Sequence, residues 1–134
     1  MLGLASALVT LLGGDAVRRG CLSVPLGSCD QFQPWADNCR LARVEILEGA
    51  ENNLPDQSSL KAAEKIVELV SSLTSRDPVI VLVSGGGSAL LPLPLSGITL
   101  QDKLEVRNGS INYCWFNFHL LEQFFILGCS VCRQ

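Results

Sequence analysis

The residues best suited to chemistry form one run of two serines and three glycines, namely Ser84, Gly85, Gly86, Gly87 and Ser88. Glycine lets backbone N–H groups turn toward one point and approach a ligand closely, and the serine hydroxyls add hydrogen-bond donors. A phosphate or a carboxylate is the ligand that suits such a run. The sequence therefore predicts an anion-binding loop, with a tight turn that holds no ligand as the alternative.

Two familiar phosphate-binding motifs do not fit this run. It contains no lysine, which a Walker A loop requires. A dinucleotide fingerprint that began at Gly85 would need its third glycine where Leu90 stands. Pro92 and Pro94 disfavour helical geometry in the residues before them, so a helix after the run is expected to last about one turn. We therefore expect the backbone amides to hold the anion with little help from a helix dipole.

A strand and a helix before the run are expected to position it. Residues Val79 to Val83 are uniformly apolar, which predicts a central parallel strand buried on both faces. In open α/β sheets, ligands bind beyond the carboxyl ends of such strands. A second strand over Val44 to Leu47 and the helix between the two would form a right-handed crossover, so these strands are predicted to be a parallel pair.

The helix of this unit is predicted to follow a cap at Asp56 or Ser58. One face should cover the sheet, and the opposite face carries charges of both signs and should point to solvent. The apolar stripe consists of Leu60, Ala63, Ile66, Val67, Val70 and Leu73.

Residues before this unit are predicted to add one helix and one strand. Leucines at helical spacing indicate a helix over the first twelve residues, ending at Gly13, and it begins without a capping residue or a preceding strand, as though part of the domain were missing. A strand is expected over Gly20 to Val24. The segment from Leu26 to Arg43 shows no period and is expected to be an irregular surface connection, with Cys29 and Cys39 as plain loop thiols.

The composition limits the classes of function. A chain of 134 residues suits one domain, and 48% hydrophobic residues with a mean hydropathy of +0.33 make it more apolar than an ordinary domain. The net charge of -3 and the lack of a basic cluster argue against nucleic acid. No apolar run is long enough to cross a membrane, and the first twelve residues lack the basic start of a signal peptide. The six cysteines are expected to be free thiols in a reducing compartment.

Several motifs, taken in chain order, resemble one enzyme family. The run from Val81 to Pro92, followed by Gly97 to Lys103, closely resembles the amino-terminal domain of the class II glycerate kinases, animal type. Glu48 to Asp56 and Cys21 to Pro25 continue the likeness upstream. The Ser-Gly-Gly-Gly-Ser-Ala-Leu-Leu sequence is its specific part. A partial amino-terminal domain is therefore expected over residues 1–104.

The resemblance implies a fold, a reaction and a site. The fold would be α/β, a partial Rossmann-like parallel sheet with covering helices in an incomplete domain. The reaction would transfer a phosphoryl group from ATP, with Mg²⁺ on the nucleotide, to D-glycerate, giving 2-phosphoglycerate. Ser84 to Ser88 would hold either the glycerate carboxylate or the nucleotide phosphates. Asn53 and Asp56 would border the same cleft, with an ordinary capping turn as the alternative for these two residues.

The resemblance also implies what this chain lacks. The family places a Gly-Lys-Ala motif, which carries an active-site lysine, immediately before the first helix, and that motif is missing here. No catalytic or metal-binding residue is therefore assigned, and negligible activity is expected from this chain alone. The expected location is the cytoplasm, with the mitochondrion as the alternative.

Residues 105–134 differ in character from the rest. They hold six of the eight aromatic residues, three of the six cysteines and the only histidine, without a clean helical or alternating period. We expect a divergent, poorly ordered tail from an alternative or read-through terminus. We do not expect a zinc or redox role for Cys129 and Cys132, because the sequence offers no second pair of ligands. We also do not expect a catalytic role for His119, which has no acid or nucleophile near it in the sequence, or glycosylation at Asn108, which does not occur in the cytosol.

The sequence also allows two other functions. One is a catalytically silent module that binds an anion or a nucleotide and associates with the full-length enzyme. The other is a sugar-phosphate-binding or isomerase-like α/β domain, which also uses loops rich in serine and glycine at strand ends.

Overall fold

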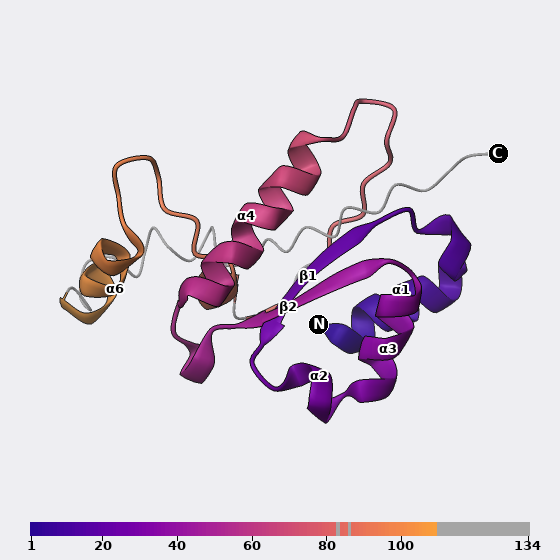
Figure 1. Cartoon of the computed structure of the whole chain (residues 1–134), viewed down its shortest axis with the longest axis horizontal. Helices are drawn as coiled ribbons and strands as arrows, with labels where there is room; N and C mark the ends of the chain where they lie inside the picture. The colour runs from indigo at the N-terminus through magenta and orange to yellow at the C-terminus, as the bar shows by residue number, and fades with distance from the viewer. Residues whose placement is uncertain (83, 86, 110–134) are drawn as a thin grey trace.

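Two parallel strands form the sheet of this protein. The computed structural model describes residues 1–82, 84–85 and 87–109. Strands β1 (Gly20–Pro25) and β2 (Val44–Gly49) pair in parallel, with Gly20 opposite Val44 and Pro25 opposite Gly49. Both predicted strands are confirmed, each slightly longer than expected. The α/β class and the incomplete parallel sheet are confirmed with them (Figure 1).

The connection between these strands is helical, so the expectation of an irregular loop there was wrong. It contains α2 (Ser28–Gln31) and α3 (Gln33–Leu41), and α3 begins with Pro34 in its first turn, a position that proline favours. Ala36 and Cys39, three residues apart, bury one face of α3, and Cys29 is buried as well. The two cysteines are therefore core residues of helices, and no longer plain loop thiols.

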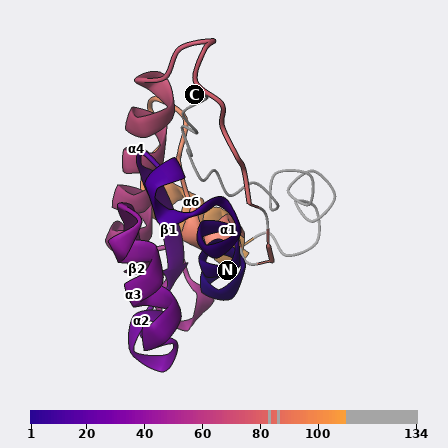
Figure 2. The same ribbon diagram turned by 90° about the vertical axis from the view of Figure 1, so that its right-hand side faces the viewer.

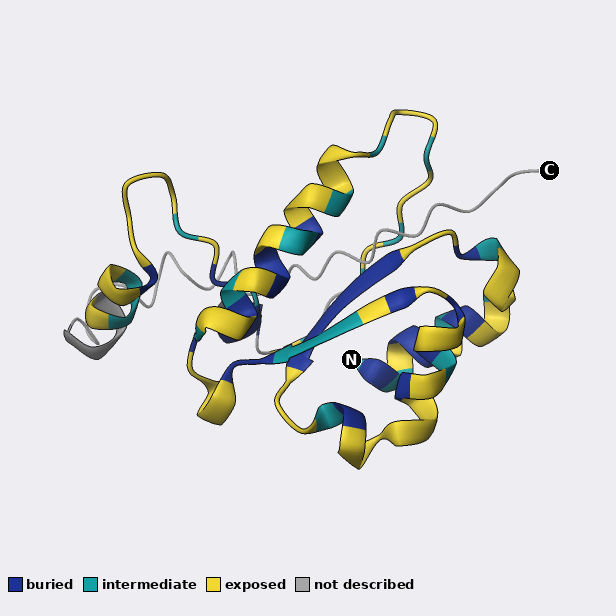
Figure 3. Ribbon diagram, viewed as in Figure 1, coloured by how far each residue is buried: buried dark blue, intermediate teal, exposed yellow. Residues whose placement is uncertain are grey.

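Helices cover the sheet and enclose one main core. Helix α4 (Gln57–Ser71) contacts both strands, whereas α1 (Leu2–Leu12) packs on α3, which contacts β2. Figure 2 shows β1 lying between α4 and α1. Strand β1 is buried along almost its whole length and is dark blue in Figure 3, whereas the middle of β2 is half-buried or exposed. Leu22, Val24 and Val44 of the strands lie in this core, together with Val17 from the segment before β1.

The predicted first helix is confirmed as α1, with Met1 at its N-cap making no side-chain capping bond. Gly13 follows its last residue with a φ of 80°, a conformation that glycine adopts without strain. A short 3₁₀ turn, η1 (Gly14–Ala16), then leads toward β1. Leu2 and Val9 are buried in the main core, whereas Leu4 and Leu11 are exposed.

Helix α4 is confirmed, with a narrower buried face than its apolar stripe predicted. Its buried residues are Ser59, Ala62, Ala63 and Ile66, so two stripe positions were correct and two small residues were missed. Val67 and Val70 remain exposed. A sheet of two strands is narrow, so it buries only the middle of the α4 face that packs on it. The apolar residues at the side of that face remain exposed to solvent.

The apolar segment from Val79 does not form the predicted buried strand. Only Ile80 makes a single bridge, and the sheet that the described residues form has no third strand. Val79 and Val81 are 42% and 43% exposed, while Ile80 and Leu82 pack against the main core. The expected pairing with Val44 to Leu47 is replaced by that of β1 with β2. The physical reason is that only one face of this segment, which carries Ile80 and Leu82, packs on the main core, while no described element covers the face that carries Val79 and Val81.

The last described helices agree with the sequence. Helix α5 (Gly87–Leu90) is one turn long, as the prolines after it predicted. Helix α6 (Leu100–Gly109) begins with the expected capping box, in which the Asp102 N–H donates to the Thr99 hydroxyl at 3.1 Å and the Thr99 N–H donates to the Asp102 carboxylate at 2.8 Å. Within the described ranges, the helices are too short or too polar to span a bilayer.

Candidate functional site

The glycine run, Ser84 to Ser88, begins in an exposed turn and ends at the buried start of α5. Ser84 is half-buried, Gly85 is exposed, and Gly87 is buried where it begins α5. The carbonyl of Gly87 accepts a hydrogen bond from the Leu91 N–H at 2.9 Å, which closes the single turn of α5. A Cβ added to Gly85 would meet nothing within 4 Å, so a ligand can approach the backbone there. Gly86 and the side chain of Ser88 lie outside the described residues.

A buried hydrogen bond fixes α5 against the sheet. Ser23 of β1 is fully buried, and its hydroxyl donates to the Leu90 carbonyl at 2.8 Å. Ser23 belongs to the carboxyl half of β1, so the glycine run lies near the edge of the sheet where ligands of α/β proteins bind. Because the bond is buried, it holds this position more firmly than an exposed one would.

A second loop meets α5 at the same edge. Ala50, the residue after β2, forms a small buried cluster with Ala89 and Leu90. The 3₁₀ turn η2 (Glu51–Asn53) follows directly, and its three residues are exposed. The structure therefore packs the start of the segment that contains Asn53 on the helix that follows the glycine run, although 39 positions of sequence separate Ala50 from Ala89.

This second loop has an unusual backbone. Ala50, Asn52 and Asn53 all adopt left-handed conformations, with φ values of 57°, 52° and 59°. Asparagine tolerates this region because its short side chain can bond locally, whereas alanine is strained there. The turn is closed by the Asn53 N–H, which donates to the Ala50 carbonyl at 2.9 Å. The sequence signalled the turn through its paired asparagines but gave no sign of the strain at Ala50.

Asp56 caps α4 and ties the loop to it. One carboxylate oxygen accepts from the Ser59 N–H at 2.7 Å, and the other accepts from the Glu51 N–H at 3.2 Å. The Ser59 hydroxyl accepts from the Asp56 N–H at 2.9 Å, which completes a capping box. Burial alone would raise the pKa of the Asp56 carboxyl, but hydrogen bonds from the backbone N–H groups of Ser59, Ala50 and Glu51 outweigh it and lower the pKa. The predicted cap at Asp56 is confirmed.

Gly49 allows the close approach that this arrangement needs. It is buried at the end of β2, and a Cβ placed there would lie 2.6 Å from the Ser59 backbone nitrogen and 3.1 Å from a carboxylate oxygen of Asp56. Any other residue would push α4 away from the strand. The glycine therefore sets how closely the capping box sits against the sheet.

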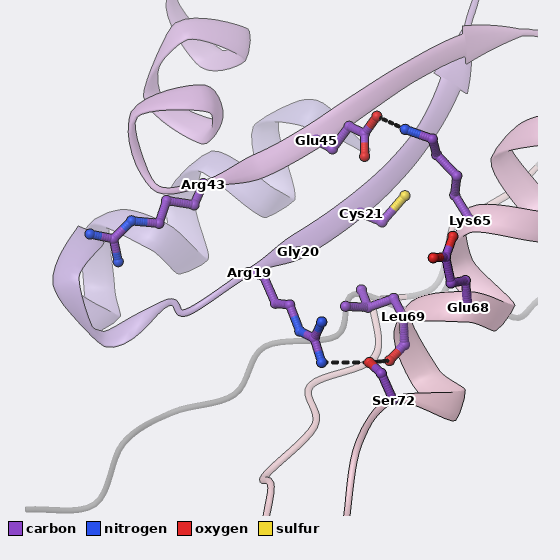
Figure 4. A pocket seen from close by; sticks show the side chains of 9 residues that line it. All are labelled: Arg19, Gly20, Cys21, Arg43, Glu45, Lys65, Glu68, Leu69 and Ser72. Atoms are coloured by element: carbon purple, nitrogen blue, oxygen red, sulfur yellow. Dashed lines mark hydrogen bonds and ion pairs between the residues drawn. The ribbon is translucent and has the colours of Figure 1, made fainter.

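A cavity lies at the opposite ends of the strands, a feature that the sequence did not reveal. Its volume is about 420 Å³, and its charged lining comes from the residues just before the two strands, Arg19 and Arg43, from Glu45 of β2, and from Lys65 and Glu68 of α4 (Figure 4). Lys65 forms an ion pair with Glu45, and the Arg19 guanidinium donates to the Ser72 hydroxyl at 2.5 Å. Burial and then the nearby Glu45 carboxylate raise the pKa of the Cys21 thiol to about 11, so this cysteine stays protonated at neutral pH.

The described part of the glycine run carries groups of the kind that bind anions. Gly85 is exposed and has a backbone N–H, and the half-buried Ser84 has a hydroxyl. The described part of the chain holds no group of three His, Cys, Asp or Glu side chains that could bind a metal. A divalent cation that arrives on a nucleotide needs no such group, because the phosphates themselves coordinate it.

Comparison with known proteins places this chain among homologues. A family model described as a domain of unknown function, DUF4147, matches residues 1–109. The glycerate kinase of Homo sapiens is 44% identical over 107 residues, and that of Bos taurus is 43% identical over 107 residues; each alignment covers 77% of this chain and 20% of the relative. The glycerate kinase of Danio rerio is 41% identical over 110 residues, which is 79% of this chain and 22% of the relative.

The chain thus spans about a fifth of the length of the curated relatives that it matches. No solved structure matches it. The alignments cover most of the described residues, so they apply to the same segment as the fold described above.

Proposed function

This chain belongs to the DUF4147 family and is homologous to the animal glycerate kinases, and on that premise we propose that it carries part of a glycerate kinase domain. In this proposal the run from Ser84 to Ser88 binds an anionic group of the substrates, and Asn53 and Asp56 border the same cleft. The substrates are ATP with Mg²⁺ and D-glycerate, and the product is 2-phosphoglycerate. The partial domain covers residues 1–104, and 105–134 form a divergent tail.

One observation carries this proposal. The Ser23 hydroxyl bond to Leu90 and the packing of Ala50 on Ala89 bring two loops together at the carboxyl ends of the strands. Ligands of open α/β sheets bind at that edge. Gly85 leaves room for a ligand, and the loop that contains Asn53 stores backbone strain, which clusters at functional sites.

The role of these residues is to bind and orient. Backbone N–H groups of the glycine run would donate to a carboxylate or phosphate, and Ser84 would add its hydroxyl. Asp56 has both oxygens engaged by backbone N–H groups, so it would hold the loop shape and would not receive a proton from the substrate. Mg²⁺ on the nucleotide would neutralise charge on the transferred group.

We propose that this chain alone has negligible kinase activity. Phosphoryl transfer depends on cations and donors positioned around the transferred group, and the relatives are about five times longer than the segment matched here. The test is an assay of purified chain for ADP formation that depends on D-glycerate. No ADP above the background without glycerate is expected. Sustained glycerate-dependent ADP formation would show that the chain holds a complete active site.

Binding is tested separately from turnover. Isothermal titration with D-glycerate, Mg-ATP and a hexose phosphate should give saturable heats with glycerate or the nucleotide. Gly85→Ala should weaken that binding, because its methyl group enters the open space beside the loop, and should leave stability unchanged. Gly14→Ala is the matched control, since its Cβ would meet only Ala42 at 3.9 Å, far from the site. Binding of the hexose phosphate alone would favour the sugar-phosphate alternative instead.

A second function is favoured by the exposed apolar segment before the glycine run. Val79 and Val81 expose apolar side chains while their neighbours Ile80 and Leu82 pack on the core. An uncovered face of this kind suits a non-catalytic module that associates with a full-length glycerate kinase. Co-purification of tagged chain with the full-length enzyme tests this role, with Val81→Lys as the variant expected to release it. Equal recovery with and without the substitution would count against it.

A further inference from the structure

We propose that Ala50 is a positioning residue, which fixes α5 and the end of the glycine run by packing its methyl group on Ala89 and Leu90. This role rests on the proposed function, because the glycine run is the part of the site that Ala50 would hold in place. Ala50 touches no substrate in this proposal and acts through α5.

Ala50 contacts α5 from the end of β2. It is 3% exposed and shares a buried apolar cluster with Ala89 and Leu90. Leu90 is also held from β1, where the Ser23 hydroxyl donates to its carbonyl at 2.8 Å. The single turn of α5 is therefore attached at both strands, by a hydrogen bond to β1 and by packing on the residue after β2. Because α5 begins at Gly87, these contacts also fix the end of the glycine run.

The backbone of Ala50 is left-handed, with a φ of 57° and a ψ of 51°. Glycine adopts this conformation without strain, whereas alanine does not. Glycine at this position would remove the strain, but it would also remove the methyl group from the cluster with Ala89 and Leu90. The methyl group thus gives a reason for an alanine at a position that favours glycine, and strain of this kind is typical of functional sites.

Three contacts hold Ala50 in this conformation. Before it, Gly49 packs so closely on α4 that an added Cβ would lie 2.6 Å from the backbone of that helix. After it, the Asn53 N–H donates to the Ala50 carbonyl at 2.9 Å. The Asp56 carboxylate accepts from the Ala50 N–H and, at 3.2 Å, from the Glu51 N–H. The carboxylate that caps α4 therefore also sets where the methyl group of Ala50 lies.

These contacts form a continuous path from the N-terminus of α4 to the glycine run. A ligand binds more tightly when the N–H groups that receive it are already held in one arrangement, because less ordering is required on binding. Without the Ala50 methyl group, α5 can move away from the end of β2. The fraction of molecules with the donors in place then falls, and the affinity falls with it.

The experiment uses the full chain and the variant Ala50→Gly. Glycine keeps the left-handed backbone and removes only the methyl group, so relief of strain offsets the lost burial and the melting temperature should change little. The Leu91 N–H, which closes the turn of α5 by donating to the Gly87 carbonyl, should exchange with deuterium about tenfold faster. The amide chemical shifts of Gly85 and Gly87 should change without any ligand.

Ala42→Gly is the matched control. Ala42 is 2% exposed and lies just before β2, at the opposite end of the strand from Ala50. Its φ is −86°, so glycine relieves no strain there and the melting temperature should fall. The Leu91 exchange rate and the Gly85 amide shift should stay as in wild type.

A conservative variant and a ligand add two further readouts. Ala50→Ser restores the β-carbon, so it should return the Leu91 exchange rate to near that of wild type. In isothermal titration with D-glycerate and with Mg-ATP, Ala50→Gly should weaken whichever ligand binds wild type about tenfold. Ala42→Gly should leave that affinity unchanged. A merely structural role for Ala50 would instead make affinity and melting temperature fall together.

Three results would overturn the proposal: Leu91 exchange in Ala50→Gly as slow as in wild type, equal changes at Leu91 in Ala50→Gly and Ala42→Gly, or an unchanged affinity in Ala50→Gly. A wild type that binds neither ligand would overturn the proposed function alone. The exchange rates and amide shifts need no ligand, so they would still decide whether Ala50 holds α5.

Discussion

Asp56 links three backbone segments through one carboxylate. It caps α4, receives the Glu51 N–H from the strained loop, and lies against Gly49 at the end of β2. We predict that Asp56→Ala lowers the free energy of unfolding by about 1–2 kcal/mol, the range for loss of a helix cap. Urea unfolding monitored by circular dichroism measures the change. Ser58→Ala, in the first turn of the same helix but exposed, is the control and should have little effect.

We also expect Asp56 to make the free energy of unfolding depend on pH. The pKa of the Asp56 carboxyl is lower in the folded protein than its ordinary value, so its stabilising effect is present above about pH 4 and is lost as the pH falls through the folded pKa. Asp56→Asn retains a capping oxygen and has no charge to lose. The difference in free energy of unfolding between wild type and Asp56→Asn should therefore shrink as the pH falls below about 4 and through the folded pKa. A difference that stays constant throughout the acid range would contradict the assignment.

The position of Gly49 leaves no room for a side chain. An added Cβ would lie 2.6 Å from the Ser59 backbone nitrogen, so α4 must move. We expect Gly49→Ala to cost about 1–3 kcal/mol, the range for overpacking in a well-packed core. Thermal unfolding measures this loss, with Gly14→Ala as the control in open surroundings. Equal melting temperatures for the two variants would mean that the strand and α4 do not meet as closely as described.

At the scale of elements, a single hydroxyl holds α5 on the sheet. Ser23 is fully buried in β1 and donates to the Leu90 carbonyl. Ser23→Ala would leave that buried carbonyl without its donor, a loss of about 1–3 kcal/mol. We also expect faster hydrogen exchange at the Leu91 N–H, which closes the turn of α5. Slow exchange there in Ser23→Ala would show that α5 is held by packing on Ala50 instead.

The sequence predicted those features whose hydrogen-bond partners lie within a few residues of each other. The cap of α4, the single turn of α5 and the capping box of α6 each depend on residues within a few positions of one another. The strand predicted from Val79 does not form in the described structure. A run of apolar residues becomes a strand buried on both faces only where other elements cover both faces, and the sequence of the run does not reveal those elements. Helix α3 was missed because its buried face is short, with Ala36 and Cys39 as its buried residues.

At the scale of the whole molecule, burial protects the thiols. Cys21, Cys29 and Cys39 are all free and buried, and burial is the main cause that raises the pKa of each thiol. We predict that iodoacetamide at neutral pH labels these three slowly in the native chain and rapidly in urea. Peptide mapping by mass spectrometry separates them from the other cysteines. Fast native labelling of Cys21 would contradict its raised pKa of about 11.

The sequence by itself determined the two strands, the helices α1 and α4, and the kinship with glycerate kinases, because these depend on periodicity, caps and a specific loop motif. Only the tertiary structure decided which segments pair, that Ala50 after β2 packs on Ala89 and Leu90 of α5, and that Arg19 and Arg43 line one cavity. Those facts depend on contacts between residues far apart in the chain. Parallel strands joined by a helical crossover leave no local trace of such contacts in the sequence.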